Sequence, residues 1–133
     1  MPVTAFEELL ADELQIYGAD HPQTLPTRGY LAQWRGQAGD ATGAIAEYEG
    51  LLADEPRIEG ADHPQTLVTR GHLAQWRGLA GDAEGAAAEY EELSAAARVI
   101  LGANHPVTLA SAEVSRRQRL SAERGEAGGN GEL

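Results

Sequence analysis

Apolar residues recur along most of this chain at the spacing of an α-helix rather than of a strand. Between residues 22 and 38 they are Leu25, Leu31, Ala32, Trp34 and Ala38, which fall on one side of a helix. The segment that follows Gly39 shows a second stripe of the same kind. Two helices separated by a glycine are therefore predicted here, because glycine readily ends a helix in the left-handed conformation.

The whole two-helix pattern returns 42 residues further along the chain. Residues 18–53 and 60–95 differ at seven of 36 aligned positions, and a third, partial copy begins at Gly102. A period of this length is typical of stacked helical units, each too small to bury its own apolar face alone.

Each unit is predicted to hold a helix A followed by a helix B. Helix A is expected at about 22–38 and 64–80, and helix B ends near Gly60 and Gly102. The chain opens with a helix B at about 3–17 and closes with a helix A at about 106–124. The predicted fold is all-α, with about six helices in the order B-A-B-A-B-A.

The domain boundaries follow from this repeat phase. One domain is expected over residues 1–124, with a half repeat at 3–17, full repeats at about 18–59 and 60–101, and a half repeat at 102–124. The glycine-rich segment 125–133 is predicted to be disordered. Pro56 is expected to kink or shorten its helix, because proline removes a backbone hydrogen bond and clashes one turn back.

The octapeptide GADHPQTL at 18–25 returns unchanged at 60–67 and as GANHPVTL at 102–109. Asp and His are common metal ligands, but copies on successive repeats would lie about 10 Å apart. That spacing is too wide for a shared coordination shell with bonds of about 2 Å. Asn104 replaces the aspartate in the third copy, which a turn tolerates. The motif is therefore interpreted as a turn between helices, and no metal or cofactor is expected.

Composition and charge narrow the possible functions. Aromatic residues make up only 5% of the chain, and it has no cysteine, which excludes disulfides and a thiolate site. A formal net charge of −11 disfavours nucleic-acid binding. No apolar run approaches the roughly 18–20 residues that span a bilayer, and the N-terminus lacks the basic start of a signal peptide. We expect a cytoplasmic protein without membrane contact.

The segment GADHPQTLPTRGYLAQWRGQAGDATGAIAEYEGLLA at 18–53 and its copy at 60–95 resemble the tetratricopeptide repeat (TPR) family in its 42-residue, kinesin-light-chain-like form. The resemblance covers about residues 3–124. It implies a right-handed α-solenoid of antiparallel helix pairs, whose concave wall is lined by the A helices and binds a protein or peptide.

The family's groove positions map onto uncharged residues and one arginine of this sequence. The candidate partner-binding residues are Tyr30, Gln33, Gln37, His72, Gln75, Leu79 and Arg117. Relatives often carry Asn where Tyr30 and His72 stand, so a standard extended-peptide mode is not implied. No Ser-His-Asp or paired-carboxylate arrangement emerges, and a non-enzymatic module that binds a basic or neutral partner is the first hypothesis.

The two ends of the chain suggest a second hypothesis, self-assembly. Residues 1–17 carry four acidic and no basic residues, whereas residues 110–124 carry four arginines against two glutamates. An open helix B at one end and an open helix A at the other could join copies end to end into a homo-oligomer. The candidate self-association residues are Glu7, Glu8, Asp12, Arg116, Arg117 and Arg119. A fragment of a larger bacterial regulatory or signalling repeat protein is a third possibility.

Overall fold

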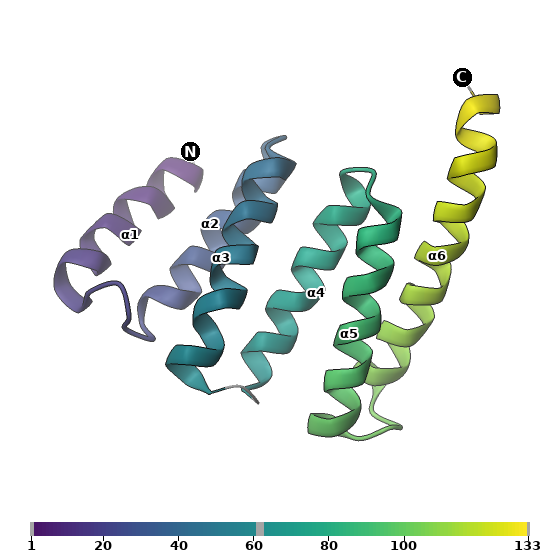
Figure 1. The fold of residues 1–133 in the computed structure, drawn as a ribbon. Helices are drawn as coiled ribbons and strands as arrows, with labels where there is room; N and C mark the ends of the chain where they lie inside the picture. The colour runs from purple at the N-terminus through teal and green to yellow at the C-terminus, as the bar shows by residue number, and fades with distance from the viewer. Residues whose placement is uncertain (1, 61–62, 133) are drawn as a thin grey trace. The chain divides into compact units, whose positions relative to one another are not determined.

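The computed structural model describes residues 2–60 and 63–132, with side chains described at 3–60 and 63–124. Six helices follow one another, and the described residues contain no strand (Figure 1). The helices are α1 (Pro2–Tyr17), α2 (Thr24–Gln37), α3 (Ala41–Glu59), α4 (Pro64–Leu79), α5 (Ala83–Leu101) and α6 (Pro106–Glu132). This confirms the all-α prediction and the number of helices. The disorder predicted for 125–133 falls outside the part of the chain described with side chains.

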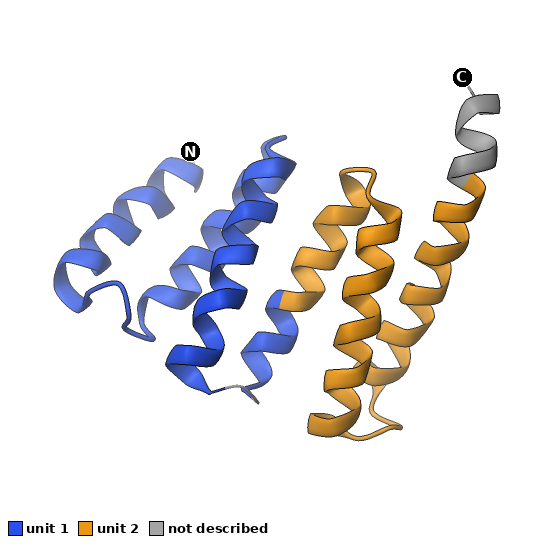
Figure 2. Ribbon diagram, in the orientation of Figure 1, with its two compact units in different colours: residues 1–69 blue, residues 70–133 orange. Residues whose placement is uncertain are grey.

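The chain divides into two compact units, residues 1–69 and 70–133 (Figure 2). The division falls inside α4, so unit 1 holds α1, α2, α3 and the first turns of α4. In unit 1, α2 packs against both α1 and α3. Burial follows the apolar stripes read from the sequence, since α2 contributes Leu31 at 2% exposure and α3 contributes Leu51 at 1%.

Unit 2 holds the rest of α4 together with α5 and α6, and α6 packs along α5. Its core repeats that of unit 1 at positions 42 residues later: Leu73 stands for Leu31 and Leu93 for Leu51, and both are buried. The A and B helices approach closely because the A helix carries a glycine at the contact. A Cβ atom on Gly71 would lie 3.7 Å from the Leu93 side chain.

Each B helix of a full repeat begins with the same local device. The Asp40 carboxylate accepts a hydrogen bond from the Gly43 backbone N–H at 2.8 Å, and Gly39 before it ends α2 at φ +99°. Asp82 and Gly85 repeat the cap at 2.8 Å in front of α5. A Cβ atom on Gly43 would lie 2.1 Å from the Asp40 Oδ2 atom. The cap therefore requires glycine three residues after the aspartate.

Because of this cap, Gly43→Ala is expected to change the free energy of unfolding in opposite directions in the wild-type and the Asp40→Ala proteins. Asp40→Ala should lower the free energy of unfolding by about 1 kcal/mol through loss of the cap. Gly43→Ala alone should lower it by about as much, because the new methyl group displaces the capping carboxylate. In the Asp40→Ala background, Gly43→Ala should instead raise it by about 0.5 kcal/mol, since alanine favours a helix. Urea unfolding of the wild type, the two single variants and the double variant measures these changes. An effect of Gly43→Ala with the same sign in both backgrounds would contradict the capping explanation.

The repeated Asp-His motif closes the turn in front of each A helix. The Nδ1 atoms of His21, His63 and His105 each accept a hydrogen bond from the backbone N–H two residues later, at 3.0, 3.1 and 3.1 Å. The imidazole thus caps a helix N-terminus, and its Nδ1 atom is occupied. Within the described residues, no three His, Cys, Asp or Glu side chains gather as a metal site would require.

The structure corrects three details of the sequence reading. α3 runs through Pro56 to Glu59, so the proline does not shorten the helix. α2 begins at Thr24 rather than at Pro22, whereas α4 begins at its proline. Trp34, which the sequence places on the apolar side of its helix, is 37% exposed, whereas the corresponding Trp76 is buried.

Candidate functional site

Tyr30 is the most exposed aromatic residue of the predicted site in unit 1. Its side chain is 58% exposed, and its ring stacks on Phe6 of α1, with centroids 5.6 Å apart. Phe6 occupies the position that Tyr48 fills in α3, 42 residues later, where the side chain is 2% exposed. The contact of Phe6 with Tyr30 joins two helices, so neither helix shows it in its own sequence pattern. Together the two rings form an aromatic surface across α1 and α2.

Gln33 and Gln37 differ in what they offer a partner. Gln33 accepts a hydrogen bond from the Tyr48 hydroxyl at 3.1 Å, so its side chain contributes to packing between α2 and α3. Gln37 is exposed at the C-terminal end of α2. Tyr30 and Gln37 are therefore the predicted residues of unit 1 that remain open to a partner.

Unit 2 contains the remaining predicted residues. His72 is half-buried, and burial lowers the pKa of its imidazole below the ordinary histidine value, which favours the neutral form at neutral pH. Gln75 is exposed and Leu79 is 67% exposed on the same helix. Arg117 is exposed on α6 and forms an ion pair with Glu113 at 3.3 Å. The exposed surface of α4 is thus neutral, as expected from the sequence.

Several of the charges assigned to self-association already have partners within the chain. Glu7 pairs with Arg35 of α2 at 2.9 Å. Arg116 pairs with Glu113 at 2.6 Å, and Arg119 pairs with Glu91 of α5. Glu8 and Asp12 are exposed on α1. Self-association stays a prediction, with fewer open charges than the sequence suggested.

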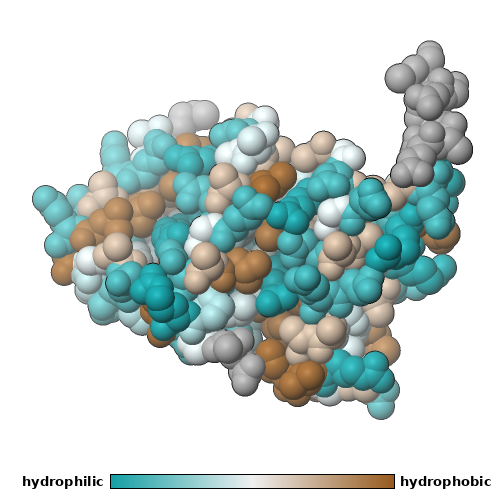
Figure 3. Space-filling model, viewed as in Figure 1, coloured by the Kyte–Doolittle hydropathy of each residue, from teal (hydrophilic) through white to brown (hydrophobic). Residues whose placement is uncertain are grey.

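Apolar side chains are also exposed on α1. Leu9 is 45% exposed and Ile16 is 72% exposed, and Figure 3 shows hydrophobic surface over this helix. Leu51 of α3 stands 42 residues after Leu9 and is buried against α2, where a Cβ on Gly29 would lie 3.9 Å from its Cδ1 atom. Leu9 is exposed because, among the described residues, no A helix covers that side of α1.

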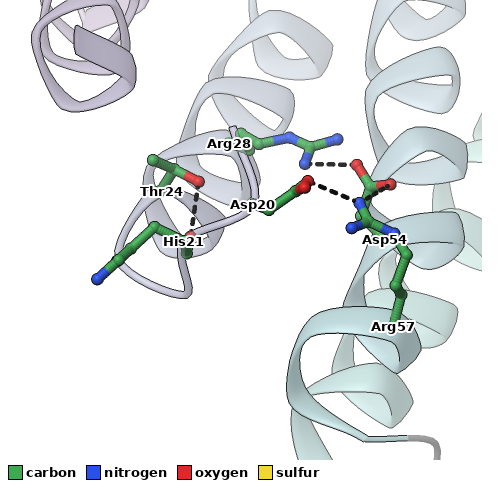
Figure 4. Close-up of polar contacts among 6 residues, drawn as sticks. All are labelled: Asp20, His21, Thr24, Arg28, Asp54 and Arg57. Atoms are coloured by element: carbon green, nitrogen blue, oxygen red, sulfur yellow. Dashed lines mark hydrogen bonds and ion pairs between the residues drawn. The ribbon is translucent and has the colours of Figure 1, made fainter. Parts of the chain in front are cut away.

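An alternating charge network in the first repeat was not predicted (Figure 4). Arg28 of α2 pairs with Asp54 of α3 at 2.8 Å, and Arg57 bridges Asp54 at 3.1 Å and Asp20 of the Asp-His loop at 3.0 Å. A hydrogen bond from Arg28, and to a smaller extent one from Arg57, holds the pKa of the Asp54 carboxyl below its usual value. The second repeat has Ala96 in place of Asp54, so the full network belongs to the first repeat alone.

None of the described helices is long and apolar enough to cross a membrane. The geometry defines a helical-repeat protein in which each full repeat is an antiparallel A and B pair.

Comparison with known proteins shows which type of helical repeat this is. The chain has the fold of TPR-like repeats, as its similarity to two crystal structures shows. Both contain nearly identical TPR-like repeats from Podosopora anserina that carry the name of a kinesin light chain, and the second is a single-substitution variant of the first. Their TM-scores are 0.80 and 0.79 at 22% identity, and each match covers 94% of this chain and 59% of the other. No family model and no curated protein matches the sequence.

Proposed function

We propose that this chain is a non-enzymatic, cytoplasmic interaction module that binds a protein or peptide through the exposed surfaces of its A helices. The observation that carries the proposal is the exposed Tyr30 ring held in place by Phe6. An aromatic side chain fixed by a neighbour offers a large contact area and loses little conformational entropy on binding. Gln37 in unit 1, and Gln75 and Leu79 in unit 2, supply further neutral contacts.

The charge of the chain restricts the partner. A net charge of −11 repels acidic surfaces at long range, so a basic or neutral partner associates faster. The neutral form of His72 is consistent with this, because it adds no positive charge to the surface of α4. The proposed ligand surface is therefore neutral and aromatic within an acidic protein.

Two substitutions test this proposal. Tyr30→Ala and His72→Ala should each weaken partner binding at least fivefold, by loss of aromatic and polar contact area. The partner is first captured from a lysate of the source cells with the wild-type chain, then purified, and its affinity for each variant is measured by calorimetry. Because Tyr30→Ala also removes the stack on Phe6, Tyr30→Phe serves as the variant that keeps this contact.

The control is Val99→Ala, since Val99 is 84% exposed on the B helix α5. It should leave the affinity unchanged. An unchanged affinity in both Tyr30→Ala and His72→Ala, or an equal loss in Val99→Ala, would show that binding does not use the A helices.

Self-association is the second candidate, and the exposed Leu9 and Ile16 on α1 favour it. The α6 helix likewise exposes Leu109 at 56% and Leu120 at 41%. Both ends could therefore bury apolar surface between copies. Light scattering at high protein concentration and low salt tests this candidate, and a strictly monomeric chain under these conditions would contradict it.

A further inference from the structure

A polar cleft lies between the B helix α5 and the A helix α6, away from the residues proposed above to bind a protein. Its volume is about 450 Å³, within the range of small-molecule sites. Three arginines, two serines, two alanines and one glutamate line it. All of them belong to unit 2, so the shape of the cleft depends on one unit alone.

The floor of the cleft consists of two serines at positions where other helices of this chain carry leucine. Ser94 of α5 stands where α3 has Leu52. Ser115 of α6 stands where α2 has Leu31 and α4 has Leu73, which are both buried. Serine is much smaller than leucine, so the two differences leave space between α5 and α6. The cleft therefore results from the residues of these two helices.

The two serine hydroxyls are already used as donors. The Ser94 hydroxyl donates to the Thr108 backbone carbonyl at 3.2 Å, and the Ser115 hydroxyl donates to the Ala87 carbonyl at 2.9 Å. They fix the floor and leave recognition of a ligand to the charged groups around it.

The three arginines of the cleft are Arg98 of α5 and Arg116 and Arg119 of α6. Glu91, the one carboxylate of the lining, pairs with Arg119. Glu113 lies outside the lining and holds Arg116 at 2.6 Å. Arg98 forms no ion pair with any residue whose side chain is described. In a chain whose net charge is −11, this lining has an excess of positive charge and favours an anion.

The arginines of α6 are accessible because this helix carries charged residues where the other A helices carry small ones. Glu113 stands where α4 has Gly71, and Arg116 stands where α4 has the fully buried Ala74. The side chain of Arg116 is 62% exposed and that of Arg119 is 53% exposed. This face of α6 therefore lacks the small residues that allow a close helix contact in the full repeats, and it presents guanidinium groups instead.

We propose that this cleft binds a small phosphate monoester. A guanidinium group offers two parallel N–H donors to a phosphate, and the three terminal oxygens of a phosphate monoester match the three arginines. The organic part of the ligand would lie against the Ala95 and Ala112 side chains of the same cleft. A phosphorylated serine of another protein carries the same group, but a volume of about 450 Å³ fits a small molecule.

The probe for this site is phenyl phosphate, titrated into the full ¹⁵N-labelled chain at low salt and followed by NMR. The amide signals of Ala95, Arg98, Ala112 and Ser115 should shift and approach saturation by about 10 mM probe, as a millimolar dissociation constant requires. Phenyl sulfate has the same shape and one negative charge less, so it should bind at least threefold more weakly.

Substitution of Arg98 is the main test, because this arginine has no ion pair to lose among the residues whose side chains are described. Arg98→Ala should weaken phenyl phosphate binding at least fivefold. Arg98→Lys keeps the charge but loses the forked donors, so it should recover only part of the affinity. Arg124→Ala is the matched control at an exposed position of α6 outside the cleft, and it should leave the affinity unchanged.

A second variant tests the cleft without changing its charge. Ser94→Leu combined with Ser115→Leu restores the leucines of the other helices and should fill the floor. It should weaken binding at least tenfold, while circular dichroism shows that the chain remains helical. Tyr30→Ala should leave the affinity for phenyl phosphate unchanged, so the result is independent of the protein-binding surface.

Four results would overturn the proposal. The first is an equal loss of affinity in Arg124→Ala and Arg98→Ala, which would indicate attraction by general charge. The second is equal affinity for phenyl sulfate and phenyl phosphate. The third is the absence of shifts at these amides with the wild-type chain. The fourth is a blocked peptide with one phosphoserine that binds at least tenfold more tightly than phenyl phosphate, which would make a phosphorylated protein the ligand.

Discussion

Gly29→Glu is expected to lower the free energy of unfolding by about 3 kcal/mol, because the new side chain forces α2 and α3 apart. A Cβ atom at this position already lies 3.9 Å from the Leu51 Cδ1 atom, and Leu51 is 1% exposed. The longer side chain must either displace Leu51 or hold a carboxylate against it. Guanidinium chloride unfolding followed by circular dichroism measures the loss.

Gly29→Ala is the matched control and should act in the opposite direction. Its methyl group makes an ordinary van der Waals contact at 3.9 Å, and alanine gains about 0.5–1 kcal/mol over glycine inside a helix. Gly71 repeats this arrangement at 3.7 Å from Leu93 and should respond in the same way. If Gly29→Glu changed stability by less than about 0.5 kcal/mol, close approach of the helices could not be the reason for glycine.

The same position explains why α6 differs from the other A helices. Glu113 stands where α2 has Gly29, and it pairs with Arg116 at 2.6 Å. Arg116 in turn stands where α2 has Ala32, which is fully buried. The two small residues that admit a close B helix in the full repeats are thus replaced by an ion pair.

The second prediction concerns Glu55, a carboxyl group buried at 1% exposure on α3. Burial raises the pKa of this carboxyl, and the nearby Glu59 charge raises it further, although a hydrogen bond from Thr69 opposes the change. The Oε1 atom of Glu55 has no hydrogen-bond partner among the described residues. Ala97 occupies the equivalent place in α5 and is fully buried, so the fold does not require a carboxylate there.

Glu55→Gln should therefore stabilise the protein at pH 8 by about 1–2 kcal/mol and change little at pH 4. A raised pKa means that the folded chain holds the Glu55 proton more tightly than the unfolded chain does. The favourable contribution of Glu55 is complete below its unfolded pKa and is lost as the pH rises through its folded pKa. Urea unfolding from pH 4 to pH 8 measures this dependence in both proteins.

Asp54→Asn, one residue away, is a control with the opposite sign. The pKa of Asp54 is lowered by Arg28 and Arg57, so its contribution is present above its unfolded pKa and lost as the pH falls through its folded pKa. Asp54→Asn should destabilise the protein at neutral pH and converge with the wild type in acid. If the free energies of unfolding of Glu55→Gln and the wild type changed in parallel with pH, the pKa of Glu55 would not be raised in the folded protein.

Much of this fold is determined by short stretches of the sequence. The 42-residue period, the helical spacing of Leu25 and Leu31, and the Asp40 cap predict six helices and their ends. The reason is physical, because helical periodicity, caps and positive-φ glycines act between residues at most four apart. The Asp-His turn belongs to the same group, since His21 caps the backbone two residues later.

The roles of the candidate site residues were decided by the tertiary structure. Gln33 could not be separated from Gln37 in the sequence, because its partner Tyr48 lies 15 residues away on another helix. Glu7 and Arg119 each find their partner 28 residues away, on a neighbouring helix. Pairing between helices partly neutralises these charges, although the side chains stay exposed, and a pattern read along one helix does not record this pairing. The sequence by itself determined the repeats, and packing between helices decided which side chains remain available to a partner.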